Sequence, residues 1–331
     1  MGHEIRLVTE TALRDAIKLS VPIVDCIELA FRQLSGGGVE MPPVLSMAMK
    51  DINAEVDVKT AYIPGLEGFA IKVSPGFFNN PSIGLPSLNG LMVLLSARTG
   101  QVLAVFLDNG YLTDVRTAAA GAVAARHLAP QDVRCMGVLG TGVQAKLQVQ
   151  AAAQVRSFER VFVWGRDFSK AEQLANELAN EMNVSVSAVK TADEAVVDSQ
   201  LVVTTTPAIE PILSVQALHS CLHITAMGSD QHEKNEIDPR VLAAADLVVC
   251  DRISQCETMG ELRSALQSGA LQSKAHVQEL GDIIRAPEKG RLNEEQITVC
   301  DLTGTGIQDT AIATVALQLA REQGIGTTVE T

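Results

Sequence analysis

The chain has no excess of basic residues, no long apolar run and no clustered cysteines. Its 331 residues carry a net charge of −13, whereas a protein that binds the phosphate backbone of nucleic acids needs a basic face. No stretch approaches the roughly 18 consecutive apolar residues of a membrane-spanning helix, and the first residues lack the basic and then apolar pattern of a signal peptide. We therefore expect a cytoplasmic protein that binds neither nucleic acids nor membranes.

The six cysteines are scattered, with no C-x-x-C spacing and no histidine cluster beside them. Zinc sites and disulfide frameworks both depend on such spacing. Four of the six stand in or beside apolar strand or helix patterns, where a cysteine packs as a small apolar side chain. We predict no structural metal and no disulfide.

From residue 133 onward, strand and helix patterns alternate. Short β-branched runs are typical of buried parallel strands, and amphipathic segments between them indicate helices. A capping box, Thr191 followed by Glu194, begins one of these helices. The alternation predicts an α/β fold with a doubly wound parallel sheet covered by helices on both faces. The expected strands are 133–139, 160–164, 184–189, 201–205, 223–226, 247–250 and 297–301, and the expected helices include 144–156 and 169–180.

The first 125 residues follow a different pattern. Strand-like runs succeed one another without long connections, which favours an antiparallel or mixed sheet. The C-terminal segment 309–321 has the period of a helix, and we expect it to pack back on this first region. The prediction is a discontinuous α+β domain of residues 1–125 and 305–331, and a second domain of residues 126–304. The expected helices are 21–34, closed by glycines, and 112–127, and the expected strands are 44–49, 57–62, 68–74, 91–95 and 102–107.

The first strand of the alternating region runs directly into Gly140-Thr-Gly-Val-Gln-Ala145. G-x-G-x-x-A between a strand and a helix is typical of dinucleotide binding. Gly140 permits the tight turn, Gly142 lets the backbone approach a pyrophosphate, and Ala145 lets the helix pack closely on the strand. The helix N-terminus adds N–H groups and the positive end of its dipole. An ordinary glycine-rich turn is the alternative, but the flanking pattern favours an NAD(P)-binding Rossmann-type domain.

The choice between NAD and NADP depends on the end of the next strand. An acidic residue about 20 positions after the glycines binds the ribose 2′-hydroxyl of NAD, whereas an arginine there accommodates the 2′-phosphate of NADP. Gly165 stands at the usual acidic position and Arg166 follows it, so we favour NADP over NAD. Asp167 is the rival that would favour NAD, and Ser169 and Lys170 either assist the phosphate or belong to the next helix.

Four ordered motifs carry a resemblance to a known family. Leu112-Thr113-x-x-Arg116-Thr-Ala-Ala stands just before the glycine motif. Ile71-Lys72-Val73, Gly228-Ser-Asp230 and Gly304-Thr-Gly-Ile-Gln-Asp309 are the other three. Together with the glycine motif they resemble the ornithine cyclodeaminase and mu-crystallin family, which also contains amino-acid dehydrogenases and cyclic imine reductases. The resemblance implies a homodimer joined through the sheet of the first domain.

The resemblance implies that Lys72 and Arg116 hold the substrate carboxylate and that Asp230 is the catalytic acid or base. A guanidinium and an ammonium suit a carboxylate independently of the family. The alternatives are structural: Lys72 as a surface strand residue, Arg116 in an ion pair with Asp114 or on a cofactor phosphate, and Asp230 as a helix cap. We assign a catalytic role to Asp230 and Lys72. The predicted cofactor-binding residues are Thr113, Arg116, Gly140, Thr141, Gly142, Val143, Gln144, Arg166, Thr205 and Gly304.

One segment departs from the family pattern. Members that act on ornithine have a further arginine in a Pro-Arg segment, where this chain has Met41-Pro-Pro-Val-Leu45. The chain is instead similar to the ectoine-utilisation cyclodeaminase-like subgroup and to imine reductases. We therefore expect reduction of a small α-imino acid, such as iminosuccinate or a cyclic ketimine, with NADP or NAD. The alternatives are a cyclodeaminase of an ornithine-like diamino acid and a non-catalytic protein that binds NADPH and a small ligand.

Overall fold

The computed structural model describes residues 2–331. The chain divides into two compact units, Met1–Thr117 with Thr305–Thr331 (unit 1) and Ala118–Gly304 (unit 2). The first boundary lies inside α3 (Tyr111–Leu128) and not at residue 125. Sequence patterning placed it near the end of this helix because α3 continues through the boundary without a break.

Unit 1 contains a seven-stranded sheet with the order β15-β1-β6-β5-β4-β3-β2. The strands pair antiparallel except for β1 with β6, which are parallel. The sheet is therefore mixed, one of the two expected forms. The strands β1 and β15, the first and last strands along the chain, were not predicted; β15 forms one edge of the sheet and β1 pairs with it. The strands are β1 (Glu4–Thr9), β2 (Leu45–Met49), β3 (Ala54–Ala61), β4 (Gly68–Phe77), β5 (Leu91–Ser96), β6 (Val102–Leu107) and β15 (Thr327–Glu330).

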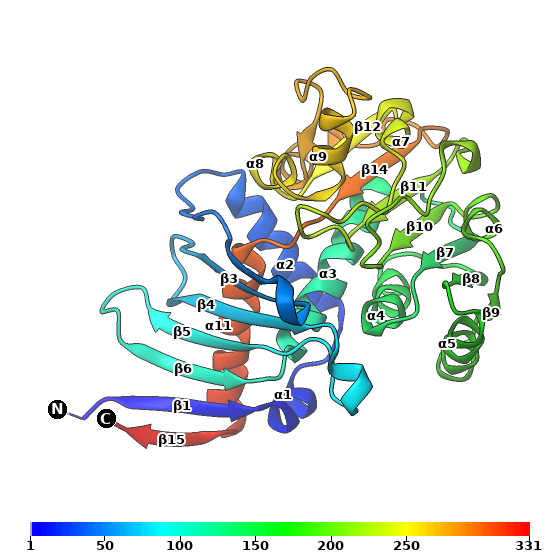
Figure 1. The fold of residues 1–331 in the computed structure, drawn as a ribbon. Helices are drawn as coiled ribbons and strands as arrows, with labels where there is room; N and C mark the ends of the chain where they lie inside the picture. The colour runs from blue at the N-terminus through cyan, green and yellow to red at the C-terminus, as the bar shows by residue number, and fades with distance from the viewer. Residues whose placement is uncertain (1) are drawn as a thin grey trace. The chain divides into compact units, whose positions relative to one another are not determined.

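One face of this sheet is covered by the C-terminal helix α11 (Gly306–Gln323), which packs on β3, β4, β5 and α2 (Figure 1). Its start is fixed by two contacts. A Cβ at Gly306 would collide with the backbone of Thr60, so only glycine allows the helix to begin this close to β3. Thr310 then donates to the carbonyl of Ala61 at 2.7 Å and accepts from the N–H of Ala70 at 3.0 Å. The other helices of this region are α1 (Glu10–Ala16) and α2 (Val21–Leu34), with 3₁₀ turns at Lys50–Ile52 and Asn80–Ile83.

Unit 2 contains an eight-stranded sheet with the order β13-β12-β14-β11-β10-β7-β8-β9, and every pair is parallel (Figure 1). The order reverses at β7, as in doubly wound folds. The predicted fold class is confirmed. The strands are β7 (Cys135–Leu139), β8 (Arg160–Trp164), β9 (Ser185–Ala188), β10 (Leu201–Thr204), β11 (His223–Ala226), β12 (Leu247–Cys250), β13 (Gln278–Glu279) and β14 (Thr298–Asp301).

The helices of unit 2 differ from the predictions mainly at their ends. α4 (Val143–Ala152) is shorter than the predicted segment 144–156, because the chain turns after Ala152 and Arg156 uses its guanidinium to bind the carbonyl of Pro130 at 2.9 Å. The hydroxyl of Thr191 caps α6 as predicted. The other helices are α5 (Phe168–Glu181), α6 (Ala192–Val196), α7 (Pro239–Ala244), α8 (Ile253–Cys256), α9 (Gly260–Gln267) and α10 (Leu280–Arg285), with 3₁₀ turns at Val215–Ala217 and Pro287–Lys289.

The structure contains no helix, over residues 2–331, that is both long and apolar enough to cross a membrane.

Candidate functional site

The glycine motif forms the turn between β7 and α4. Gly140 has φ +135° and donates its N–H to the carbonyl of Trp164 at 2.8 Å, and a Cβ there would collide with the side chain of Thr205. Gly142 is the N-cap of α4, and no side chain caps the helix. A Cβ at Gly142 would meet no atom within 4 Å, so its backbone borders open space. The positive end of the α4 dipole is therefore presented to an anion.

A cleft of about 740 Å³ extends from this turn. A cleft at the carboxyl ends of the strands, beside the reversal of strand order, is where open α/β sheets bind ligands. It contains the predicted residues Gly140, Thr141, Gly142, Arg166 and Thr205. Val143, with 63% of its surface exposed, begins α4 directly behind the turn, and Gln144 follows it. The lining residues are Gly140–Gly142, Trp164–Asp167, Lys170, Thr205–Ile209 and Ile212.

Three residues after β8, Gly165, Arg166 and Asp167, line the cleft. An acidic residue cannot replace Gly165 without moving Thr141, because a Cβ at Gly165 would collide with the Thr141 methyl group. Asp167 accepts from the N–H of Ser169 at 3.0 Å and from its hydroxyl at 2.6 Å, and so acts as the cap of α5. Arg166 forms no hydrogen bond or ion pair with residues 2–331. Its guanidinium can thus bind a phosphate.

In unit 1, two buried cations share one carboxylate. Lys72 on β4 places Nζ 3.3 Å from Oδ2 of Asp309, and Arg116 on α3 donates from Nε to Oδ1 of Asp309 at 3.0 Å. Arg116 Nη1 donates to Oε1 of Gln308 at 2.8 Å. The side chains of Lys72 and Arg116 are 3% and 5% exposed, and that of Asp309 is fully buried. Arg116 therefore pairs with Asp309 and Gln308 rather than with Asp114.

Burial controls the protonation of this cluster. Burial lowers the pKa of Lys72 to about 7, the charges of Arg116 and Lys59 act in the same direction, and Asp309 opposes them. Lys59 lies opposite Lys72 on the neighbouring strand β3. Burial raises the pKa of Asp108 to about 6, although its carboxylate accepts from the N–H of Leu112 at the start of α3. An added negative charge would favour the protonated form of Lys72.

Donor groups remain available around the two cations. Arg116 Nη2 bonds to no protein group among residues 2–331, and Lys72 has three donors but contacts a single acceptor, Asp309, within the same residues. Within the same described range, Thr113 Oγ1 and Gln308 Nε2 are buried without a hydrogen-bond partner. Buried polar atoms are rarely left unpaired. The arrangement therefore fits an anionic, oxygen-rich group such as a carboxylate.

Sequence analysis named Lys72, Arg116 and Thr113 as site residues but did not predict Asp309, Gln308 or Asp108 as partners of the two cations. Gln308 and Asp309 end the last of the four motifs, which was the available signal. Their contact with Lys72 depends on how α11 packs on β4, and spacing along the chain does not reveal that packing.

The remaining predicted residues lie in unit 2. Asp230 follows β11 in a loop, its side chain is 42% exposed, and its Oδ1 accepts from Nζ of Lys234 at 2.6 Å. It does not cap a helix. Gly304 has φ +78° and donates its N–H to Asp251 at 2.8 Å.

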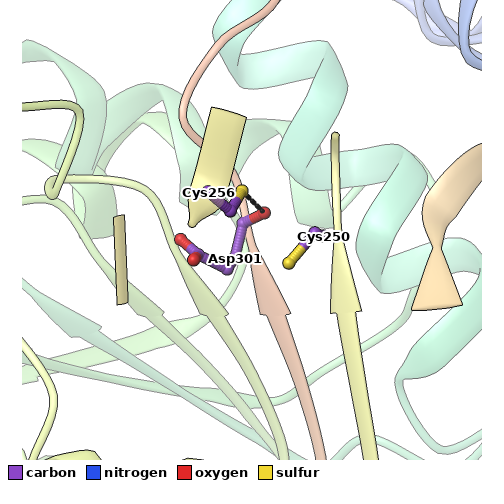
Figure 2. Close-up of side chains that lie close together, drawn as sticks. All are labelled: Cys250, Cys256 and Asp301. Atoms are coloured by element: carbon purple, nitrogen blue, oxygen red, sulfur yellow. Dashed lines mark hydrogen bonds between the residues drawn. The ribbon is translucent and has the colours of Figure 1, made fainter. Parts of the chain in front are cut away.

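One group of metal-ligating side chains comes together within the described residues. Cys250, Cys256 and Asp301 offer ligand atoms within 4.8 Å of one another, and all three are buried (Figure 2). Burial raises the pKa of Cys250 to about 11 and those of Cys256 and Asp301 well above their ordinary values. Metal binding requires these groups to lose their protons, and structural zinc takes four ligands. Asp301 already caps α9 by accepting from the N–H of Leu262 at 2.9 Å. The absence of a structural metal stays a prediction.

Comparisons with known proteins agree with the resemblance found in the sequence. An uncharacterized cyclodeaminase of Sinorhizobium fredii is 51% identical over 327 residues, which cover 98% of this chain and 99% of that protein. Δ1-Pyrroline-2-carboxylate reductase of Thermococcus litoralis, solved with NADH and L-proline, matches with a TM-score of 0.93 and 28% identity over 98% of this chain and 100% of that one. Iminosuccinate reductase of Paracoccus denitrificans, solved with NAD⁺, matches with a TM-score of 0.89 and 28% identity over 99% and 100% of the two chains.

The family model described as the ornithine cyclodeaminase/mu-crystallin family matches residues 4–324. The match extends over nearly the whole chain and includes all four motifs and the glycine turn. The chain therefore belongs to the ornithine cyclodeaminase/mu-crystallin family.

Proposed function

We propose that the protein is an NAD(P)H-dependent reductase of a small α-imino acid. The observation that carries this proposal is the buried pair Lys72 and Arg116, which share the single carboxylate of Asp309 and keep donors for a further anion. An α-carboxylate fits those donors. The dinucleotide turn of unit 2 and the names of the two similar reductases support the redox chemistry.

Three side chains have distinct roles in this proposal. Arg116 and Lys72 fix the substrate carboxylate and thereby orient the α-carbon. Asp230 exchanges a proton with the substrate nitrogen, which becomes more basic as the imine is reduced to an amine. A nicotinamide cofactor held beside them would supply hydride chemistry for the α-carbon. Residues Gly140–Gly142, Thr205 and Arg166 would hold the cofactor.

The second candidate is a cyclodeaminase of an ornithine-like diamino acid. The name of the Sinorhizobium fredii relative favours it, whereas the segment Met41–Leu45, without the arginine of ornithine-specific members, favours the reductase. Absorbance at the nicotinamide band separates the two. The protein is incubated with reduced cofactor and a panel of α-imino acids that includes iminosuccinate and Δ1-pyrroline-2-carboxylate. If it is a reductase, reduced cofactor is consumed in proportion to the product formed. An ornithine-like diamino acid is tested beside the panel: ammonia release from it without net change in absorbance would show a cyclodeaminase, and binding without turnover of any compound would show a non-catalytic protein.

The geometry after β8 favours NADP, and Arg166→Ala tests this preference. The variant is expected to weaken NADPH binding by about 1.5–3 kcal/mol, because only the 2′-phosphate forms charge-assisted hydrogen bonds with the guanidinium. NADH binding should change little. The measurement is a fluorescence titration of both cofactors. Arg160→Ala, at an exposed arginine of β8, is the matched control. Equal losses for both cofactors, or tighter binding of NADH by the wild type, would contradict the preference.

We also propose that unit 1 is the substrate and dimerisation domain. The sheet face opposite α11 has apolar side chains that are only partly exposed, among them Val58, Ile71, Val93 and Val105. At the edge strand β2, Leu45 continues this face with 63% exposure. An apolar face of this extent is typical of an interface, and a second copy of the chain would bury it.

Sedimentation velocity tests the dimer. The wild type is expected to sediment as a dimer, and Val93→Glu as a monomer, because a buried unpaired charge opposes association. Leu29→Glu is the control, since Leu29 is 54% exposed on α2 and lies outside this sheet face. A monomeric wild type, or a Val93→Glu variant that stays dimeric, would reject the interface.

A further inference from the structure

Two glutamates are buried in unit 2 and have no part in the mechanism above. Glu236 is fully buried, and its carboxylate accepts three hydrogen bonds. The donors are the hydroxyl of Thr204 at 2.6 Å, the N–H of Thr206 at 2.5 Å and the N–H of Gly228 at 2.7 Å. Thr206 belongs to the loop after β10, which lines the nucleotide cleft, and Gly228 belongs to the loop after β11, which contains Asp230. One carboxylate therefore joins two loops of the site.

The close approach at Gly228 requires glycine. A Cβ at this position would lie 2.5 Å from Cδ of Glu236 and would also collide with the carbonyl of Thr206. The first residue of the Gly-Ser-Asp motif is therefore a glycine because its backbone lies against the buried carboxylate of Glu236. This contact gives the motif a function besides that of presenting Asp230.

Glu261, on α9, binds the segment after β11 that contains both Asp230 and Glu236. Its Oε1 accepts from the hydroxyl of Ser229 and from the N–H of Glu236 at 2.7 Å, and its Oε2 accepts from the N–H of Ile237 at 3.2 Å. Ser229 immediately precedes Asp230. Glu236 thus holds the backbone N–H of Gly228, and Glu261 holds the hydroxyl of Ser229, so both residues that precede Asp230 are fixed by a buried carboxylate.

We propose that Glu236 is a positioning residue that, together with Glu261, fixes the loop of Asp230 against the loop after β10. This inference rests on the proposed function, because it matters for catalysis only if Asp230 exchanges the proton. Glu236 itself touches neither substrate nor the reacting atoms. Catalytic groups held within a fraction of an ångström depend on such supporting contacts.

The charge state of Glu236 follows from its surroundings. Burial, followed by the nearby carboxylate of Glu261, raises the pKa of Glu236 to about 7, and the hydrogen bond from Thr204 opposes this shift. Arg263 on α9 and the ion pair of Asp230 with Lys234 are the other charged groups near the two loops. Three donors converge on Glu236, so the ionised form satisfies them best. Protonation replaces one acceptor site with a donor and loosens the loops.

Hydrogen–deuterium exchange of the whole protein, with kcat measured in parallel, tests the proposal. Glu236→Gln puts an amide NH₂ among the three donors. It is expected to speed exchange in residues 204–208 and 226–230 and to lower kcat by roughly 10²-fold, as for a catalytic group displaced by about an ångström. His223→Gln, at a fully buried position on β11, is the matched control for general destabilisation and should leave exchange in these loops unchanged.

A milder variant keeps the test open if Glu236→Gln does not fold. Thr204→Val removes one of the three hydrogen bonds, so exchange in both loops should rise by a smaller amount. The loss of this bond also raises the pKa of Glu236. When the two proteins are acidified, the increase in loop exchange should therefore begin at a higher pH in Thr204→Val than in the wild type. A role in stability alone would not move this pH dependence.

The outcomes separate this inference from the proposed function. Unchanged loop exchange in Glu236→Gln, or an equal increase in His223→Gln, would overturn the positioning role. Faster loop exchange with unchanged kcat would support the structural link and overturn the role of Asp230 in the reaction.

Discussion

Asp230→Asn is expected to lower kcat by roughly 10²–10⁴-fold on the α-imino acid substrate. Asparagine is nearly isosteric but cannot exchange a proton, and proton transfer to the nitrogen is needed as the amine forms. Cofactor affinity should change little, because Asp230 is not among the residues that line the nucleotide cleft. Steady-state kinetics and a cofactor titration measure the two effects separately.

Asp132→Asn is the matched control for this variant. Asp132 is in the same unit, its side chain is 75% exposed, and it pairs only with Arg134 on the surface. Its kcat should equal that of the wild type. If Asp230→Asn keeps near wild-type kcat, the proton must come from another group or from water, and the assignment of Asp230 is wrong.

The second large effect concerns pH. Because burial lowers the pKa of Lys72 to about 7, the free protein loses the positive charge that binds the substrate carboxylate as the pH rises above that value. Wild-type kcat/KM is expected to fall by roughly tenfold per pH unit on this alkaline side. Lys72→Arg keeps its charge throughout, because arginine is not deprotonated in proteins, so its alkaline fall should disappear.

Lys72→Met removes the charge at every pH. Its KM is expected to rise by roughly 10–100-fold, since a hydrogen bond to a charged group contributes about 1.5–3 kcal/mol. Initial-rate kinetics from neutral to alkaline pH give all three profiles, and circular dichroism verifies that the variants are folded. A flat wild-type profile above pH 7, or an unchanged alkaline fall in Lys72→Arg, would show that another group governs binding.

The sequence predicted individual helices and strands better than the way in which they pack together. Val21–Leu34 and Arg160–Trp164 form the predicted helix and strand with the same bounds, because period and flanking glycines are local signals. The strand β1 was missed, since its partners β6 and β15 come from distant parts of the chain. Strand order and register are tertiary properties that a single sequence does not display.

In the candidate site, too, residues in local motifs were predicted, whereas contacts that depend on packing were not. Lys72, Arg116 and Gly140 stand in motifs whose residue types indicate their chemistry. Asp309, which fixes both cations, came from the same kind of motif but acquires its meaning only when α11 packs on the sheet. The buried Glu236 gave no signal, because a glutamate between a loop and a short helix resembles any surface residue.

The discontinuous make-up of unit 1 has a consequence for synthesis on the ribosome. The residues before unit 2 leave the ribosome ahead of it, yet the N–H of His3 bonds to the carbonyl of Thr331, which follows unit 2, at 3.1 Å. The helix α11, which packs on the sheet of this unit, is also made after unit 2. Unit 2 is continuous and can fold as soon as its own residues have left the ribosomal exit tunnel. The N-terminal part of unit 1 cannot complete its fold until α11 is made, and until then the apolar face of its sheet stays uncovered. Translation speed and chaperone supply should therefore affect the yield of unit 1 far more than that of unit 2.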